Sequence, residues 1–389
     1  MKILFLAPQP FFQERGTPIA VDLMLSSLSE RRDEVDVLTF HLGENRRYDG
    51  VNIMRISPPF APASVNPGFS WKKVYCDLFL LYRAFRAVRA GRYDIVHAVE
   101  EGVFIAMLLN AFFRIPYVYD MDSSMVAQLL YRFRWLRVGQ RPLRYLETLA
   151  MRRALAVVPM CESLAERARQ HCRGIVQVVS DASLIPSGSI PNAENIRTLL
   201  DTTGPILLYV GNLERYQGLD LLLDCFVRVH RTRPDAELVI IGGTPPDIDK
   251  YRRKARALNV AQRVHLLGPR PLAALGGYLR QADLLISPRV EGDNTPLKIY
   301  SYLDSGVAVV ATDVPAHTQL VGTKEVALAA AEASAMAAAI NRLLDDPLER
   351  QALTRNARNL IGRRHTLELF CKDVDRVFGE LEAKVTGGA

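Results

Sequence analysis

Cysteine is scarce in this chain of 389 residues, and its positions follow no pattern. The five cysteines lie far apart, without the short paired spacing that a zinc ribbon uses: Cys76, Cys161, Cys172, Cys225 and Cys371. Small secreted domains held by disulfides have denser cysteines. The composition therefore argues against a disulfide framework and favours a reducing compartment.

Long apolar runs are missing too. The longest, Gly102–Phe113, is interrupted by Asn110 and falls well short of the roughly 20 residues that a membrane-spanning helix needs. The opening stretch MKILFLAPQP is too short for a secretory signal. We therefore expect a cytoplasmic protein without a membrane span, for which peripheral attachment to the inner face of the plasma membrane stays open.

The signatures of several ligand chemistries are also absent. No G-x-G-x-x-G follows the first candidate strand and no Walker A sequence occurs, which argues against a dinucleotide-binding dehydrogenase and a P-loop enzyme. Asp120 and Asp122 form an Asp-x-Asp pair, but no further carboxylate or histidine cluster accompanies them. We therefore expect no metal site.

Short apolar runs alternate with helical patterns along the whole chain. In the first half the runs lie at 2–7, 35–40, 52–56, 94–98, 116–120, 155–160 and 176–180. In the second half they lie at 205–210, 237–241, 263–267, 283–287, 307–311 and 326–328. Nearly continuous apolar runs are typical of parallel strands that are covered on both faces. The sequence thus predicts an α/β protein with two doubly wound, Rossmann-like domains.

A stretch rich in Pro, Ser and Gly at 185–192 indicates a linker between the two domains. We expect a first domain over 1–186 and a second over 187–365. A C-terminal helix within 366–389 is expected to pack back towards the first domain. Ligands of such folds bind outside the carboxyl ends of the strands.

The net charge of +7 is unevenly distributed. Positions 51–153 carry 15 Lys and Arg against seven Asp and Glu, so this part is expected to meet an anionic partner. Aromatic residues accompany the cations in 60–86, with Phe69 and Trp71, and in 132–153, where Trp135 stands among Arg134 and Arg137. This mixture is found at membrane surfaces, although it also fits a solvated basic face with aromatics in the core. Nucleic acid is not expected, because no recognition motif accompanies the charge.

Two loops hold residues suited to binding an anion or a sugar. Gly16, Thr17 and Pro18 open a helix after the first strand. Gly16 lets a ligand approach the backbone, and Thr17 is a candidate N-cap. The free N–H groups of such a helix start can hold an anion. A plain capped helix start is the alternative.

The second loop lies within Ser287–Gly306. Glu291 and Asp293 could accept hydrogen bonds from hydroxyl groups. A helix is expected to start at Thr295 or Pro296, with Lys298 in its first turn. A cation there opposes the helix dipole, so we expect a bound phosphate to supply the compensating negative charge.

These stretches together resemble the family-4 glycosyltransferases of the GT-B fold, over nearly the whole chain. The matching stretches are 16–18, 94–98, 209–213 with 217–218, 240–243, 265–268 and 291–306. The resemblance implies two Rossmann-like domains facing each other across a cleft, the acceptor on the first and a nucleotide diphosphate sugar on the second. It implies a retaining hexosyltransferase without metal or cofactor, with a UDP-sugar as donor and a lipid or lipid-linked glycan as acceptor.

The resemblance also implies site residues. Catalytic roles are implied for Lys298, for Glu291 or Asp293, and for His97, Glu100 or Glu101 in the first domain. Substrate contacts are implied for Gly16, Thr17, Asp120, Gly211, Asn212, Arg215, Gly243, Gly268, Arg289, Asn294, Thr295, Pro296, Leu297 and Ser301.

The chain departs from the family pattern at four positions. Asn212 and Gln217 stand where an Arg and a Lys usually hold the diphosphate. Ser301 replaces a glutamate and Val99 a histidine. We expect Lys298, with Arg289 or Arg215, to replace the missing cations. The departures leave two alternatives open: a non-catalytic subunit that binds a sugar nucleotide, and a nucleotide-sugar epimerase on the same fold.

Overall fold

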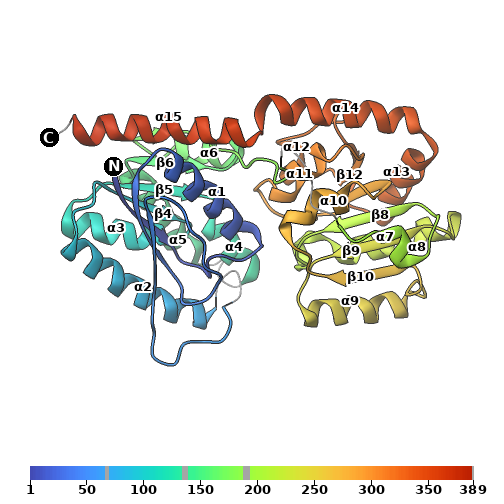
Figure 1. Ribbon diagram of the computed structural model, residues 1–389, viewed down its shortest axis with the longest axis horizontal. Coiled ribbons are helices and arrows are strands. Elements are labelled where there is room, and N and C mark those ends of the chain that lie inside the picture. The colour runs from blue at the N-terminus through green and yellow to red at the C-terminus, as the bar shows by residue number, and fades with distance from the viewer. Residues whose placement is uncertain (66–69, 134–138, 187–192, 388–389) are drawn as a thin grey trace. The chain divides into compact units, whose positions relative to one another are not determined.

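The computed structural model describes residues 1–65, 70–133, 139–186 and 193–387, which form two compact units (Figure 1). Unit 1 comprises Met1–Ser180 and Phe370–Ala389, and unit 2 comprises Asp181–Leu369. The sequence placed this division between 186 and 187. Most of the expected linker, residues 187–192, lies outside the described residues.

Unit 1 is built on a parallel sheet with the strand order β3-β2-β1-β4-β5-β6-β7. Its strands are β1 (Lys2–Ala7), β2 (Glu34–Thr39), β3 (Val51–Arg55), β4 (Ile95–Val99), β5 (Tyr117–Met121), β6 (Ala156–Pro159) and β7 (Ile175–Val176). The strand order reverses between β1 and β4, which makes their carboxyl ends the switch point of this unit. The expected strand at 176–180 is only the two-residue β7.

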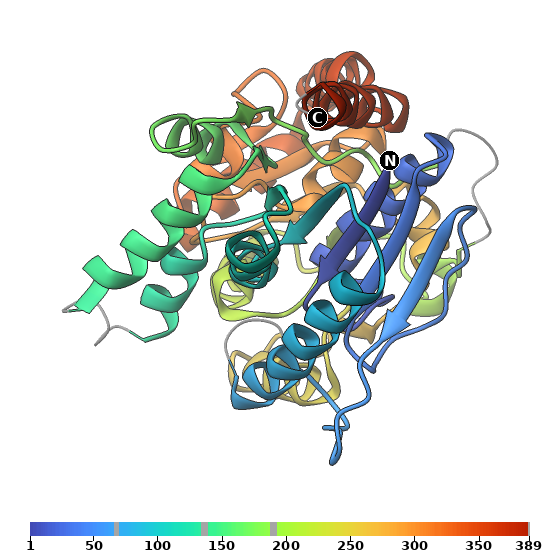
Figure 2. The same cartoon turned by 90° about the vertical axis from the view of Figure 1, so that its left-hand side faces the viewer.

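Helices cover both faces of this sheet (Figure 2). They are α1 (Gly16–Glu30), α2 (Trp71–Ala90), α3 (Gly102–Phe113), α4 (Met125–Arg132), α5 (Gln140–Arg153), α6 (Glu162–Arg169) and α15 (Leu367–Thr386). Side chains alternate along β1: Leu4 and Leu6 join the core beneath α2, α3, α5 and α6. Phe5, between them, stacks on His97 of β4.

The C-terminal helix α15 packs on unit 1 from Phe370 onwards. Phe378 of α15 stacks on His97, with 5.7 Å between the ring centroids. Arg31, which follows α1, pairs with Asp375 at 3.1 Å and with Glu382 at 3.6 Å. A helix distant in sequence thereby covers one face of the unit 1 sheet.

Unit 2 repeats the design with a parallel sheet in the order β10-β9-β8-β11-β12-β13. Its strands are β8 (Ile206–Val210), β9 (Glu237–Ile241), β10 (Val264–Gly268), β11 (Leu284–Ser287), β12 (Val309–Thr312) and β13 (Ala327–Ala329). Here the order reverses between β8 and β11.

Two apolar cores flank the unit 2 sheet. One face carries α8 (Leu219–Thr232), α9 (Pro245–Ala257) and α13 (Ala333–Asp345). The other carries α7 (Ile196–Leu200), α10 (Leu275–Leu279), α11 (Leu297–Asp304) and α14 (Pro347–Arg364). Shorter helices are η2 (Arg215–Gln217), η3 (Leu272–Ala274) and α12 (Pro315–Thr318).

The five cysteines are free thiols. Within the described ranges, no helix is both long and apolar enough to cross a membrane. In the same ranges, no three His, Cys, Asp or Glu side chains are grouped so that they could hold a metal ion.

Candidate functional site

Two buried or half-buried cations meet at the switch point of unit 2. Lys298 is the second residue of α11, and Arg289 lies in the loop after β11. The loops that follow β8 and β11 are neighbours because these two strands pair. The fold therefore places both cations at the sheet edge where α/β proteins bind ligands.

Lys298 is held by uncharged partners. Its Nζ donates to Oε1 of Gln217 at 2.8 Å and lies 4.0 Å from the centroid of the Tyr209 ring. A Cβ on Gly211 would lie 3.3 Å from this Nζ, so the absence of a side chain there lets the amine approach the backbone. Burial, and secondly the charge of Arg289, lower the pKa of Lys298 well below the ordinary value of 10.5.

Arg289 organises the loop around it. Its Nε donates to the Glu291 carbonyl at 2.7 Å, and its Nη2 donates to Oδ1 of Asn294 at 2.6 Å. Its guanidinium also lies 5.2 Å from the centroid of the Tyr216 ring. Gly292 has φ +119°, and a Cβ there would lie 2.1 Å from Nη2 of Arg289. The loop can therefore close over the guanidinium only with glycine at this position.

Positive charge is concentrated at this sheet edge. The hydrogen bonds of Lys298 and Arg289 go to uncharged oxygens, while the charge of the exposed Asp293 in the same loop acts on Arg289. The first turn of α11 adds backbone N–H groups, and its N-cap, Pro296, makes no side-chain hydrogen bond to them. Two cations and an uncapped helix start are the elements of an anion site.

His317 is a site residue that the sequence reasoning missed. It is fully buried on α12, where Nδ1 lies 2.8 Å from the Thr312 carbonyl and Nε2 lies 2.8 Å from Oγ of Ser287. A carbonyl only accepts, so we assign the proton to Nδ1, and Nε2 accepts from Ser287. Burial lowers the pKa of His317 to about 4. The neutral ring thus links the end of β11 to the end of β12 and adds no positive charge to the site.

Glycines shape the neighbouring turns. The amide of Gly211 donates to Ile241 at 3.0 Å, and the amide of Gly242 donates to Gly268 at 2.9 Å. Gly242 has φ +111°, and a Cβ there would lie 2.2 Å from the Gly211 carbonyl oxygen. At Gly243, φ +86°, a Cβ would lie 2.5 Å from Leu213. The turns after β8, β9 and β10 are therefore joined by backbone hydrogen bonds, and they pack too closely for side chains at Gly242 and Gly243.

Other residues expected in this site have different surroundings. Asn212, Arg215, Glu291 and Asp293 are exposed beside it. The expected helix start at 295 or 296 is wrong, because α11 begins at Leu297. Thr295 and Pro296 are buried ahead of that start.

Ser301 does not reach the site. It is fully buried, and its Oγ accepts from the Leu184 amide at 3.0 Å. The expectation of a substrate contact at Ser301 is therefore corrected: this hydroxyl fixes the chain that enters unit 2.

Unit 1 gathers acidic side chains at the carboxyl end of β4 and β5. Glu100 has φ +46°, its amide donates to the Asp120 carbonyl, and Ser123 donates to its Oε1 at 3.1 Å. Burial, and then the neighbouring Glu101, raise the pKa of Glu100. A strand end in this unusual conformation is a common feature of functional sites.

Lys73 of α2 forms an ion pair with Glu101, at the start of α3. Burial opposes the lysine charge, but Glu101 and Glu100 outweigh it and raise the pKa of Lys73. Burial and the charge of Glu101 raise the pKa of Asp77. The sequence reasoning had not connected Lys73 and Asp77 with these glutamates, because the strand β4 separates α2 from them in the chain.

His97 lies in the interior of unit 1. It is central in β4 and has no exposed surface. Its ring lies between Phe5, at 4.4 Å, and Phe378, at 5.7 Å, and Nε2 hydrogen-bonds Oδ2 of Asp120 at 3.0 Å. The expectation that His97 touches substrate is therefore corrected: in this structure it can position Asp120, which is half-buried at the strand end.

The start of α1 also differs from the expectation. Arg15 is the N-cap and α1 begins at Gly16. Thr17 therefore lies inside the first turn and cannot be the N-cap. Arg15 makes no side-chain capping bond, so the N–H groups of Gly16 and Thr17 keep their capacity for an anion.

Comparisons with known proteins fit this arrangement. A model described as "Glycosyl transferase 4-like domain" matches residues 15–179, and one described as "Glycosyl transferases group 1" matches residues 204–346. The alpha-D-kanosaminyltransferase of Streptomyces kanamyceticus is 23% identical over 302 residues, which cover 74% of this chain and 77% of that protein.

A second relative is the phosphatidyl-myo-inositol mannosyltransferase of Mycobacterium tuberculosis, 27% identical over 209 residues. The match covers 51% of this chain and 54% of the relative. Among solved structures, HepE of Anabaena in complex with UDP-glucose superposes with a TM-score of 0.75 at 17% identity, covering 98% of this chain and 100% of that one. A likeness at this identity concerns the fold.

Proposed function

Since the protein belongs to the family-4-like glycosyltransferases of the GT-B fold, we propose that unit 2 binds a nucleotide diphosphate sugar and transfers its sugar to an acceptor held by unit 1. The observation that carries this proposal is the pair of cations Lys298 and Arg289, whose hydrogen bonds go to the Gln217 and Asn294 amide oxygens and the Glu291 carbonyl. A diphosphate supplies the negative charge that these partners lack.

The chemistry requires such cations. When the bond between the anomeric carbon and the diphosphate oxygen breaks, its electron pair remains on the diphosphate and positive character develops on the sugar. Fixed cations and helix N–H groups stabilise the departing charge more than the ground state. Lys298, Arg289 and the first turn of α11 take this role. The acceptor hydroxyl oxygen bonds to the anomeric carbon with retention of configuration, and its proton passes to the departing diphosphate oxygen.

The proposed donor is a UDP-sugar, and no metal takes part. The complex of the structurally similar HepE with UDP-glucose supports this donor. The proposed base site lies at the turn where Gly243 follows β9 and at Gly268, which ends β10; the amide of Gly242 donates to Gly268 and joins these two turns. The exposed carboxylates of Glu291 and Asp293 are placed to accept hydrogen bonds from sugar hydroxyls.

The proposed acceptor is a lipid or lipid-linked glycan at an anionic membrane surface. The mannosyltransferase relative, whose name specifies phosphatidyl-myo-inositol, supports a lipid acceptor. In α2, Trp71, Leu78 and Tyr82 are 80%, 60% and 58% exposed, and Lys72 and Arg83 are exposed beside them. Phe69, Arg134, Trp135 and Arg137, also expected to contribute, lie outside the described residues.

Vesicle co-sedimentation tests the membrane partner. Wild-type protein should sediment with vesicles that contain phosphatidylglycerol, and the double variant Trp71→Ala, Leu78→Ala should sediment less. Equal binding of both proteins would refute a role for α2.

Turnover of labelled UDP-sugars tests the donor site. Lys298→Met removes one stabilising donor and should lower kcat by about 10²–10³-fold, while the exposed Lys324→Met control should leave kcat unchanged. Near-normal turnover by Lys298→Met would overturn the proposal. Binding of UDP without transfer to any acceptor extract would instead identify a non-catalytic subunit, and conversion of the sugar without acceptor would identify an epimerase.

A further inference from the structure

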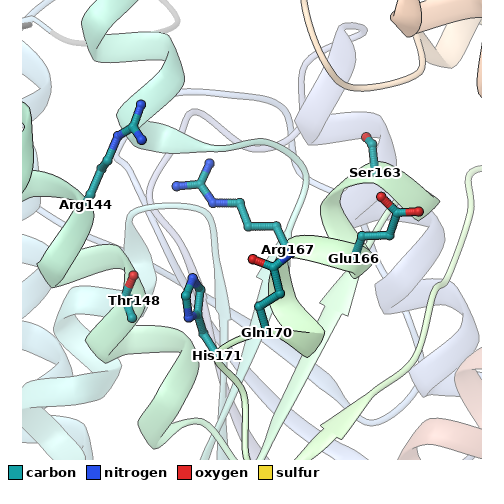
Figure 3. Close-up of a pocket in the computed structure, with 7 residues that line it drawn as sticks. All are labelled: Arg144, Thr148, Ser163, Glu166, Arg167, Gln170 and His171. Carbon is teal, nitrogen blue, oxygen red and sulfur yellow. The ribbon is translucent and has the colours of Figure 1, made fainter.

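A polar cavity of about 450 Å³, wide open to solvent, lies in unit 1 between α5 and the segment formed by α6 and the two residues that follow it (Figure 3). Arg144 and Thr148 line it from α5, and Ser163, Arg167 and His171 line it from the other side. The space is many times the roughly 30 Å³ that one water molecule occupies in the liquid. It therefore has room for a charged group and part of the molecule that carries it.

Arg167 is fixed in this cavity by the protein interior. One guanidinium nitrogen pairs with Glu147, which has no exposed surface, and the other donates to Oγ of Ser124 at 2.9 Å. Ser124 in turn donates to Glu147 and caps α4. Two of the five guanidinium N–H groups are used in this way, which leaves three for a ligand. Contacts within the protein thus fix the position of the Arg167 side chain before any ligand binds.

Arg144 adds a second cation. It is exposed and has no hydrogen-bond or ion-pair partner among the described residues. Figure 3 shows the guanidinium groups of Arg144 and Arg167 extending into the same space, while the carboxylate of Glu166 points away from them. The charge of Arg167 is already shared with Glu147, so the charge without a partner at this cavity is that of Arg144, and an anion bound between the two guanidinium groups would compensate it.

We propose that this cavity binds a phosphate group, as a phosphate monoester or the phosphodiester of a lipid headgroup. The planar arginine forks match phosphate oxygens in geometry as well as charge. The hydroxyl of Thr148 and the ring of His171 lie at the same cavity and supply further donors. The site is distinct from the proposed donor site, because all of its residues belong to unit 1.

Calorimetric titration with glycerol 1-phosphate at low salt tests the soluble form of the ligand. Arg144→Gln should weaken binding roughly tenfold, the loss expected for a charge-assisted hydrogen bond. Arg141→Gln is the matched control, because Arg141 is exposed on the same helix and does not line the cavity. Arg167 is left intact in both variants, so the buried Glu147 keeps its partner.

Vesicles of phosphatidylcholine with and without phosphatidylglycerol test the lipid source. Binding that depends on phosphatidylglycerol and falls with Arg144→Gln, but not with Arg141→Gln, assigns a lipid headgroup. The same pattern with glycerol 1-phosphate alone assigns a soluble phosphate ester.

If Arg144→Gln and Arg141→Gln weaken binding equally, diffuse surface charge holds the ligand and the proposed site is refuted. The absence of binding in both assays would overturn it too. Binding of glycerol 1-phosphate that is lost in Lys298→Ala and kept in Arg144→Gln belongs to unit 2 and likewise overturns it. None of these readouts requires sugar transfer, so their failure leaves the proposed donor site untouched, whereas the lipid outcome would extend the membrane surface proposed for α2 to α5.

Discussion

At the residue scale, Lys298 combines a charged group with surroundings that disfavour charge. Its amine has an amide oxygen, an aromatic ring and a glycine as neighbours. An ammonium without a counter-ion in such surroundings costs free energy. Under the proposed function, a bound diphosphate would offset this cost.

We predict that Lys298→Met raises the melting temperature near neutral pH. The folded pKa of Lys298 lies below the ordinary value, so the unfolded chain binds more protons between these two values. Stability of the wild type therefore rises with pH across that window. The advantage of Lys298→Met should shrink as the pH approaches the ordinary lysine pKa.

Thermal unfolding of both proteins over a pH series measures this effect, with Lys324→Met as control. A variant that melts below the wild type at neutral pH would show that the Gln217 and Tyr209 contacts outweigh the desolvation of the amine.

Sequence reasoning selected Lys298 as a candidate but did not foresee its surroundings. The cation at a helix start was visible, because it contradicts the helix dipole. Gln217 was noted only as a missing cation, whereas the structure makes it the hydrogen-bond partner of Lys298. That contact depends on the pairing of β8 with β11, which joins segments about 80 residues apart and leaves no local pattern.

At the element scale, α15 completes the hydrophobic cover of unit 1. Phe378 is 1% exposed and packs on the ring of His97, which in turn holds Asp120. The helix therefore connects the core of unit 1 to a side chain at the strand end.

We predict that Phe378→Ala destabilises unit 1 by about 3–5 kcal/mol, the usual cost of removing a buried phenylalanine ring. Phe112→Ala, at a ring that is 70% exposed, should cost far less. Urea unfolding followed by circular dichroism measures both variants. Similar midpoints for the two would contradict the role given to α15.

The strands were largely predictable and the role of His97 was not. Runs such as 2–7 and 237–241 are continuous and apolar, and they became β1 and β9 with the same or nearly the same bounds. His97 stands in an equally apolar run, so the sequence placed it correctly on a strand. Its burial depends on the ring of Phe378 that covers it, and no pattern within 94–98 records a partner 281 positions away.

At the scale of the whole molecule, each of the two units has its own sheet and its own apolar core. Such units unfold as separate cooperative bodies unless a large interface couples them. A ligand that binds only one of them stabilises that one.

We therefore predict two calorimetric transitions, of which UDP raises only one. At a concentration of about 100 times its dissociation constant, UDP should stabilise unit 2 by roughly 2.7 kcal/mol. Phe378→Ala should lower the other transition. A single transition that moves as a whole with UDP would show that the units unfold together.

The division of unit 1 between the two ends of the chain also sets an order of events on the ribosome. Unit 2 is one continuous segment and can close as soon as Leu369 has left the exit tunnel. Unit 1 begins earlier but stays incomplete, with one side of His97 uncovered, until Phe378 has emerged as well. Unit 1 is thus the first unit to be synthesised and the last to fold completely. A chain truncated before residue 370 would contain a folded unit 2 and a unit 1 that lacks the cover of Phe378.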